Sequence, residues 1–355
     1  MSKTRSYTDV MPPTFQISLK HLGASLMLAT GVLCSISPAA VADSPELAMR
    51  EFASGQIKKG VRSIGFGGDG ATWGNYALVW KDAGTALADG GDTGFSNGNN
   101  FHFWAAGATT PLLWHDLAIY VIALKQDSND IHFMTSSPVW GQRQPANGQG
   151  SNQAIFTKMA MPLGNGLSAG VLLSHEVSQF STQSTVNSAR AAQYQTDWRP
   201  SGGWGLAWEK PDSSLLVGFR ALLNRDRERR IDATGTADGS AQANEYRIGA
   251  SYSPWEGALM DLGHTRLQRQ NTLNGTNTTF EAPNMGFEQS FNGNRMALRF
   301  GLDESSPGAG FTARFAAFKL DVAYIHNMAR ERVGDLFGVN SQSLIMTLNF
   351  NYQAP

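Results

Sequence analysis

Apolar and polar residues alternate along most of the chain after residue 100, which is typical of β-strands whose two faces meet different surroundings. The last segment shows this clearly, because Met346, Leu348 and Phe350 share one face while Thr347 and Asn349 share the other. The same period of two recurs over 217–223, 246–252, 296–302 and 311–327. The pattern therefore predicts an all-β protein.

A soluble sandwich and a transmembrane barrel both produce such alternation, and two features favour the barrel. The apolar face is bulky and aromatic near strand ends, while the other face mixes small, polar and isolated charged residues, which suits a lipid-facing exterior around a polar lumen. The connections also alternate in length. Short turns at 162–166, 210–214 and 254–257 alternate with long polar loops near 179–200, 225–243, 268–293 and 328–342. We expect the short turns and both chain termini on the periplasmic side.

Counting strand candidates gives the size of the barrel. They start near residues 101, 114, 131, 153, 167, 203, 215, 244, 258, 294, 311 and 343. We therefore predict a transmembrane antiparallel β-barrel of about 12 strands, within a range of 10–14, over residues 101–355.

Residues 1–42 have the pattern of a secretory signal peptide. Basic residues are followed by an apolar stretch from Leu22 to Ile36, and Ala40-Val41-Ala42 gives a small-x-small cleavage pattern. A membrane anchor is the alternative, but the apolar stretch of about 15 residues is shorter than the roughly 20 needed to span a bilayer. We expect cleavage near Ala42 and export to the bacterial outer membrane, although translation could also start at an internal Met.

Composition narrows the function classes. The formal net charge of -1 gives no electrostatic reason to expect a nucleic-acid partner. The single cysteine, Cys34, lies in the signal segment, so a disulfide-stapled secreted fold is excluded. Apolar residues make up 41% of the chain, which is too many for a disordered protein.

Residues 43–100 do not alternate and form a separate N-terminal segment. Pro45 to Lys59 is predicted to be a short helix that begins at Ser44 as the N-cap and ends at Gly60. Gly65, Gly67 and Gly70 match G-x-G-x-x-G, but the strand before and the long helix after that a dinucleotide site needs are both missing from the sequence pattern. No cofactor is expected.

This segment resembles a known family. Two motifs are similar to the N-terminal signature of the long-chain fatty acid transporter (FadL-type) superfamily: Arg62-x-x-Gly65-x-Gly67-Gly68, followed by Tyr76-Ala-Leu-Val-Trp80-Lys-Asp82-Ala83-Gly84-x-Ala86-Leu87. In that superfamily the first motif precedes Ala-Leu-x-Trp-Asn-Pro-Ala-Gly, and both belong to a plug inside the barrel. Residues 320–324 and 348–352 are similar to the family's last two strands.

The resemblance implies that 43–100 is a plug or hatch. It implies a plug and ligand-route role for Arg62, Gly65, Gly67, Gly68, Trp80, Asp82, Ala83 and Gly84. Lys81-Asp82 stands where the family has Asn-Pro, and the chain is shorter than typical fatty acid transporters, so the substrate does not follow from the resemblance.

Two functions of different classes fit these observations. The first is passive uptake of hydrophobic or amphipathic small molecules of fatty-acid or hydrocarbon type. The alternative is a structural or docking barrel for a secretion, conjugation or surface-assembly system, without transport. The expected partners are outer-membrane lipid, the barrel-assembly machinery and, for the first function, an apolar small-molecule ligand; the protein is expected to be a monomer.

Catalysis is not expected, because the sequence offers no constellation that could perform it. The histidines after residue 42 are scattered, with no pair at metal-ligand spacing. Ser174-His175-Glu176 suggests a hydrolase only superficially, since adjacent strand residues point to opposite faces.

Charged residues on the predicted lumen face are of greater interest. They are Lys158, Glu209, Arg220, Arg247, Arg299, Arg314, Lys319 and Asp321. They could pair across the lumen and hold the interior of the barrel together, or the arginines could bind an anionic head group such as a carboxylate. Placing Arg or Lys on the lipid face instead would cost about 2–4 kcal/mol at the bilayer midplane.

Overall fold

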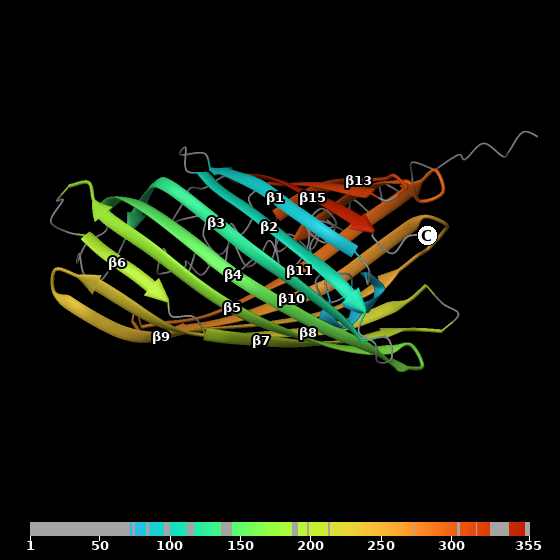
Figure 1. Ribbon diagram of the computed structural model, residues 1–355, viewed down its shortest axis with the longest axis horizontal. Coiled ribbons are helices and arrows are strands. Elements are labelled where there is room, and N and C mark those ends of the chain that lie inside the picture. The colour runs from blue at the N-terminus through green and yellow to red at the C-terminus, as the bar shows by residue number, and fades with distance from the viewer. Residues whose placement is uncertain are drawn as a thin grey trace, which may run out of the picture. The chain divides into compact units, whose positions relative to one another are not determined.

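Backbone pairing in the computed structural model closes the chain into an antiparallel β-barrel (Figure 1). The structure describes residues 72, 75–82, 85–95, 100–111, 117–135, 144–186, 191–196, 199–211, 214–273, 275–303, 306–316, 318–326 and 341–351. The predicted signal peptide and the predicted helix 45–59 lie outside these residues. No helix among the described residues is long and apolar enough to cross a membrane.

The described elements are one 3-10 helix and a series of strands. Helix η1 spans Tyr76–Asp82. The strands are β1 (Thr85–Phe95), β2 (Asn100–Pro111), β3 (Ala118–Thr135), β4 (Gln144–Gly164), β5 (Leu167–Ser184), β6 (Ala191–Thr196), β7 (Arg199–Glu209), β8 (Leu216–Asp232), β9 (Gly235–Tyr252), β10 (Ala258–Asn271), β11 (Thr276–Phe291), β12 (Met296–Asp303), β13 (Ser306–Arg314), β14 (Phe318–His326) and β15 (Ser341–Asn351).

The first and last strands close the barrel. Strand β1 pairs with β2 on one side and with β15 on the other, and Thr85 lies opposite both Thr109 and Asn351. Every other strand pairs with its sequence neighbours, except that β6 and β7 occupy successive parts of one position between β5 and β8. The described part of the chain therefore forms a barrel of 14 strands.

The predicted all-β barrel is confirmed, and the count of about 12 strands is corrected to 14. The candidate near 131 is not a separate strand, because β3 continues through it with a local irregularity between Ser128 and Ile131. The segment 311–327 is two strands, joined by a tight turn in which the Phe315 N–H donates to the Phe318 carbonyl at 2.7 Å. That turn contains neither Gly nor Pro, so the sequence did not mark it.

Two further strands escaped the alternation analysis. Strand β1 is rich in Gly, Ala and Asp, and β11 was taken for part of a long polar loop at 268–293. The loop predicted at 225–243 is also wrong, because β8 and β9 continue through it up to a turn at 233–234. Strands β8 and β9 stay paired through backbone hydrogen bonds in this region, although polar residues lie on both faces and the hydrophobic alternation has ended.

The predicted boundary of the plug at residue 100 also needs correction. Residues 85–95 belong to the barrel wall, since β1 is hydrogen-bonded to strands on both sides. Of the segment 43–100, β1 is therefore a strand of the barrel wall, whereas Thr72 and residues 75–82 belong to none of its strands.

The two faces of the wall differ in the way that alternation predicts. Along β5 every second residue is buried, and the residues between them are more exposed. The exposed set is largely apolar, as on β7, where Trp204, Leu206 and Trp208 are 43%, 40% and 40% exposed. In a closed single-layer barrel the buried face is the interior and the apolar exposed face is the exterior.

Candidate functional site

Helix η1 lies against the inner face of the wall. Tyr76 and Ala77 are completely buried, and Leu78 packs with Ala207 and Leu216 in a small apolar cluster. The elements that contact η1 include β4, β5 and β7. Residues 75–78 of the predicted plug segment therefore pack on a defined part of the lumen wall, a contact that we call the seat.

Polar contacts fix this seat at the start of η1. The Asn75 amide nitrogen donates to the backbone carbonyls of Leu206 on β7 at 2.9 Å and Phe219 on β8 at 3.0 Å. Its Oδ1 accepts from the Ala77 N–H at 2.9 Å, which sets the first turn of the helix. Further out, the Thr72 hydroxyl donates to the buried Asp261 carboxylate at 2.6 Å.

Glycines in the wall make room for the segment. A side chain at Gly170 of β5 would collide with the Tyr76 carbonyl, and one at Gly205 of β7 would collide with Asn75 Oδ1. At Gly203 an added Cβ would lie 2.9 Å from the Tyr76 ring. The close approach of the two backbones requires the absence of side chains here.

Tyr76 is the central side chain of this contact. Its ring lies 5.3 Å from the Arg220 guanidinium carbon and 5.8 Å from Lys158 Nζ, both within reach of a cation–π interaction. Burial raises the pKa of the Tyr76 hydroxyl to about 12, although the positive charge of Arg220 acts in the opposite direction. Tyr76 therefore remains a neutral phenol at physiological pH.

One buried charge network crosses β8 and β9. Arg220 and Arg247 lie directly opposite each other, and both reach the Glu245 carboxylate at 2.7 Å. Arg247 also lies 3.7 Å from Asp303 on β12. Two guanidinium groups thus face two carboxylates, which offsets the desolvation of each.

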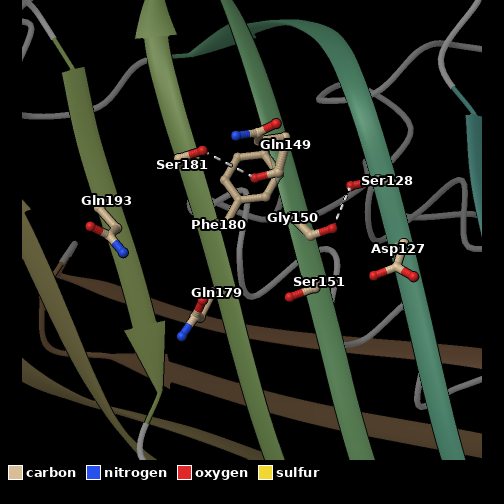
Figure 2. Close-up of a pocket in the computed structure, with 9 residues that line it drawn as sticks. All are labelled: Asp127, Ser128, Gln149, Gly150, Ser151, Gln179, Phe180, Ser181 and Gln193. Carbon is tan, nitrogen blue, oxygen red and sulfur yellow. Dashed lines mark hydrogen bonds between the residues drawn. The ribbon is translucent and has the colours of Figure 1, made fainter.

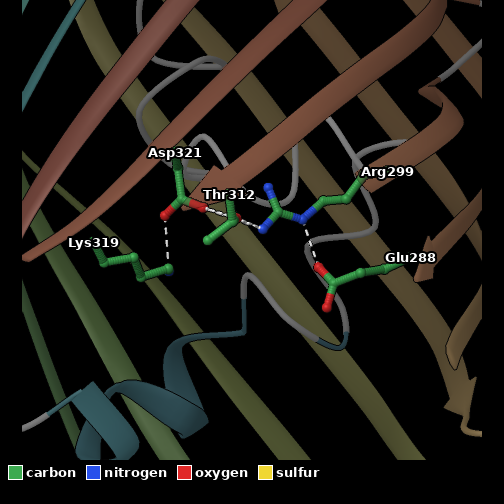
Figure 3. A network of polar contacts seen from close by, with 5 residues as sticks. All are labelled: Glu288, Arg299, Thr312, Lys319 and Asp321. Atoms are coloured by element: carbon green, nitrogen blue, oxygen red, sulfur yellow. Dashed lines mark hydrogen bonds and ion pairs between the residues drawn. The ribbon is translucent and has the colours of Figure 1, made fainter. Parts of the chain in front are cut away.

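A second network crosses β11 to β14 (Figure 3). Arg299 Nε donates to Glu288, and its Nη2 reaches Asp321 at 3.1 Å and the Thr312 hydroxyl. Lys319 Nζ lies 2.8 Å from the other oxygen of Asp321. This cluster again balances two cations against two anions.

The structure brings together most of the predicted lumen charges. Arg220, Arg247, Arg299 and Asp321 are buried on the inner face, and Lys319 is half-buried beside Asp321. Arg314 is exposed at the end of β13, opposite Lys319. Glu209 at the end of β7 is also exposed and pairs with Lys81 of η1 at 2.6 Å.

The predicted plug residues are placed less completely. Trp80 and Asp82 form part of the η1 backbone, and their side chains are not described. Arg62, Gly65, Gly67, Gly68, Ala83 and Gly84 lie outside the described residues. Their role in a ligand route stays a prediction.

Sequence reasoning missed the carboxylates of the inner wall. Buried acidic residues there include Glu176, Asp226, Glu228, Glu245, Asp261, Glu288 and Asp303. A usable signal existed for Glu245, which shares a face with Arg247 two positions away on one strand. Asp226, Glu228 and Glu288 fell in segments that were taken for loops, so their facing was not considered.

The inner wall does not assemble catalytic machinery from the residues that had suggested it. Ser174 is fully buried on the inner face and His175 is exposed on the outer face, so the two side chains point apart. Within the described residues there is no group of three or more His, Cys, Asp and Glu that could hold a metal ion.

Comparison with known proteins supports the fold. No protein-family model and no curated protein matches the chain. Solved structures do, and one is a Pseudomonas aeruginosa FadL homologue (9% identity, TM-score 0.56, covering 83% of this chain and 98% of that one). Others are the Ralstonia pickettii toluene transporter TbuX (10%, 0.55, 83% and 98%) and the Pseudomonas putida toluene transporter TodX (10%, 0.53, 82% and 98%). The barrel fold that the FadL-type resemblance implies is thereby confirmed.

Proposed function

We propose that the protein is a bacterial outer-membrane barrel for the passive uptake of hydrophobic or amphipathic small molecules of fatty-acid or hydrocarbon type. The observation that carries the proposal is the seat of residues 75–78 on glycines of the inner wall. A barrel built to accept a segment of its own chain at a fixed place has a lumen whose passage that segment can control. Solved barrels of the same fold are named as toluene transporters.

The apolar exterior supports placement in the outer membrane. Removal of the signal peptide near Ala42 is part of the same proposal and rests on the sequence pattern alone. One end of the barrel holds the turns around Asn165, Trp255 and Asn292. The first residue of β1, Thr85, and the last residue of β15, Asn351, lie at the same end. These turns are short, so we place that end in the periplasm. The turn at 233–234 then lies on the cell surface.

The inner wall favours solutes with little net charge. In each of the two networks the described cations and anions balance, so neither attracts ions strongly. Arg220 Nη1 and Arg299 Nη1 are buried and have no hydrogen-bond partner among the described residues.

Uptake by a deletion strain tests the proposal. We expect initial uptake of at least one of a long-chain fatty acid, an alkane and toluene to fall when the chain is absent and to recover when it is restored from a plasmid. Equal uptake of the whole panel would instead favour the docking barrel of a secretion, conjugation or surface-assembly system.

Conductance tests whether the N-terminal segment closes the lumen. Deletion of residues 45–82 leaves β1 in place and should open a stable large conductance in planar bilayers. An unchanged conductance from a deletion protein that still shifts on gels after boiling would contradict the plug.

A further inference from the structure

The outer face of β8 changes from apolar to basic partway along the strand. Its outward positions carry Val217, Phe219 and Leu223, and then Arg225, Arg227 and Arg229. We call the last three the arginine row. Arg225 and Arg227 are exposed and Arg229 is half-buried, whereas Asp226 and Glu228, which point inward between them, are buried.

The described ion pairs of the arginine row involve one carboxylate, that of Asp238. Arg229 Nε donates to the Asp238 carboxylate of β9 at 2.8 Å, and Arg227 lies 3.5 Å from the same carboxylate. Arg225 lies opposite the neutral Gln242. Among the described ion pairs, Arg225 therefore has no acidic partner, and Arg227 shares the Asp238 carboxylate with Arg229.

A polar hollow adjoins the arginine row. Ile231 follows the row on β8 and lies opposite Gln193 of β6, and Arg229 lies opposite Gln195. A hollow of about 760 Å³ is lined there by Gln149, Ser181, Gln183, Gln193 and Ile231, among others. A second hollow of about 440 Å³, drawn in Figure 2, shares Gln149, Ser181 and Gln193 and extends to Asp127 of β3.

These side chains are of the kinds that bind a phosphorylated sugar. Guanidinium groups bind phosphate through strong charge-assisted hydrogen bonds, and amide and hydroxyl groups can donate to and accept from sugar hydroxyls. Leu223 and Arg225 are adjacent outward positions, about 7 Å apart along the strand. An occupant that follows this surface would place hydrocarbon on the apolar band and phosphate on the arginine row.

We propose that the arginine row and the adjoining hollow bind the phosphorylated sugar head group of a glycolipid in the surrounding membrane. The inference rests on the proposed outer-membrane placement, in which this end of β8 meets the outer leaflet. The acyl chains would lie against Val217, Phe219 and Leu223, and the sugar would cover Gln149, Ser181 and Gln193.

Binding to the purified full chain in detergent tests the site without any transport measurement. The probe is diphosphoryl lipid A, titrated and followed by native mass spectrometry. R225Q/R227Q keeps the Arg229–Asp238 pair and should weaken binding at least about tenfold, because the charge-assisted hydrogen bonds from Arg225 and Arg227 to phosphate are lost. The control K210Q/R295Q removes two exposed cations at the opposite end and should bind within about twofold of the unmodified chain.

A third variant should change the affinity for lipid A in the opposite direction. D238N frees Arg227 and Arg229 from their shared carboxylate and should strengthen binding about threefold. Equal affinity for a lipid A whose phosphates have been removed, or R225Q/R227Q within twofold of the unmodified chain, would overturn the proposal. An acidic protein as the true occupant would give that second result. Unchanged uptake by the deletion strain, together with lipid A binding as expected, would count against the proposed function alone.

Discussion

The two faces of strand β8 carry charge in different ways. On the inner face Arg220 and Glu228 are each 1% exposed, and each contacts a polar side chain of another strand. On the outer face Arg227 is exposed and lies beyond an apolar stretch that ends at Leu223. The same backbone thus presents buried, hydrogen-bonded charge to the lumen. To the outside it presents exposed guanidinium groups, and the described partner of Arg227 is an Asp238 carboxylate that Arg229 also contacts.

The difference shows which constraint acts on each face. A buried ion inside the barrel must be matched by a partner, because the charge has left water. A charge on the outer face needs no partner but must avoid the lipid band, where Arg costs about 2–4 kcal/mol at the midplane. A charged residue on the inner face therefore needs a partner, whereas a charged residue on the outer face needs a position outside the lipid band.

The largest effect should follow from breaking an inner network. Arg299→Met removes the cation that contacts Glu288 and Asp321, so the buried Glu288 loses the ion pair with Arg299. Breaking a buried pair in this way costs about 3–5 kcal/mol, which urea unfolding of the barrel refolded in lipid vesicles would measure.

The double variant R299M/E288M provides the control. This variant also removes the Glu288 carboxylate and should regain part of the lost stability, because two apolar side chains replace the ion pair. If R299M alone unfolds at the same urea concentration as the unmodified chain, the inner charges do not hold the wall together.

Moving charge along the outer face should have the next largest effect. Phe300 is 57% exposed on the outer face of β12, and Phe300→Arg should lose about 2–4 kcal/mol in lipid vesicles. Ile231→Arg adds the same residue beyond the arginine row and should lose less than about 1 kcal/mol. Equal losses at the two sites would mean that the lipid band does not end between them.

Alternation predicted the facing of single residues well. Arg220, Arg247 and Arg299 were assigned inward from the period of two alone, and all three are buried. Facing is local, because it depends only on position within a strand. The barrel class followed for the same reason, since bulky apolar residues recur on one face of strand after strand.

Pairing could not be predicted in the same way, because it depends on register between strands. Arg220 lies directly opposite Arg247, and only the position of Glu245 two residues along makes that arrangement stable. Glu288 lies opposite Arg299 on a strand whose polar sequence was taken for a loop. The seat of Asn75 between β7 and β8 depends on carbonyl groups, which carry no sequence signal.

A smaller effect is expected where η1 meets the inner wall. Gly170→Val adds a side chain that collides with the Tyr76 backbone and should displace η1, with a loss of about 1–3 kcal/mol from overpacking. Conductance should rise if the segment closes the lumen. Gly202→Ala is the matched control, since its added Cβ would meet its nearest neighbour at an ordinary 3.5 Å. The same conductance for both variants would show that the seat does not hold the segment.

The smallest effect should come from an ion pair on the outer face. Arg266 Nε lies 3.4 Å from Glu281, and the two side chains are 51% and 50% exposed. Both groups keep much of their hydration and are screened by salt, so Arg266→Ala should lose less than about 1 kcal/mol, and less still in high salt. Urea unfolding at low and high salt, beside R299M, would measure the contrast. A loss from Arg266→Ala as large as that from R299M would remove the distinction between the two faces, since a cation's partner would then matter equally in the lumen and in water.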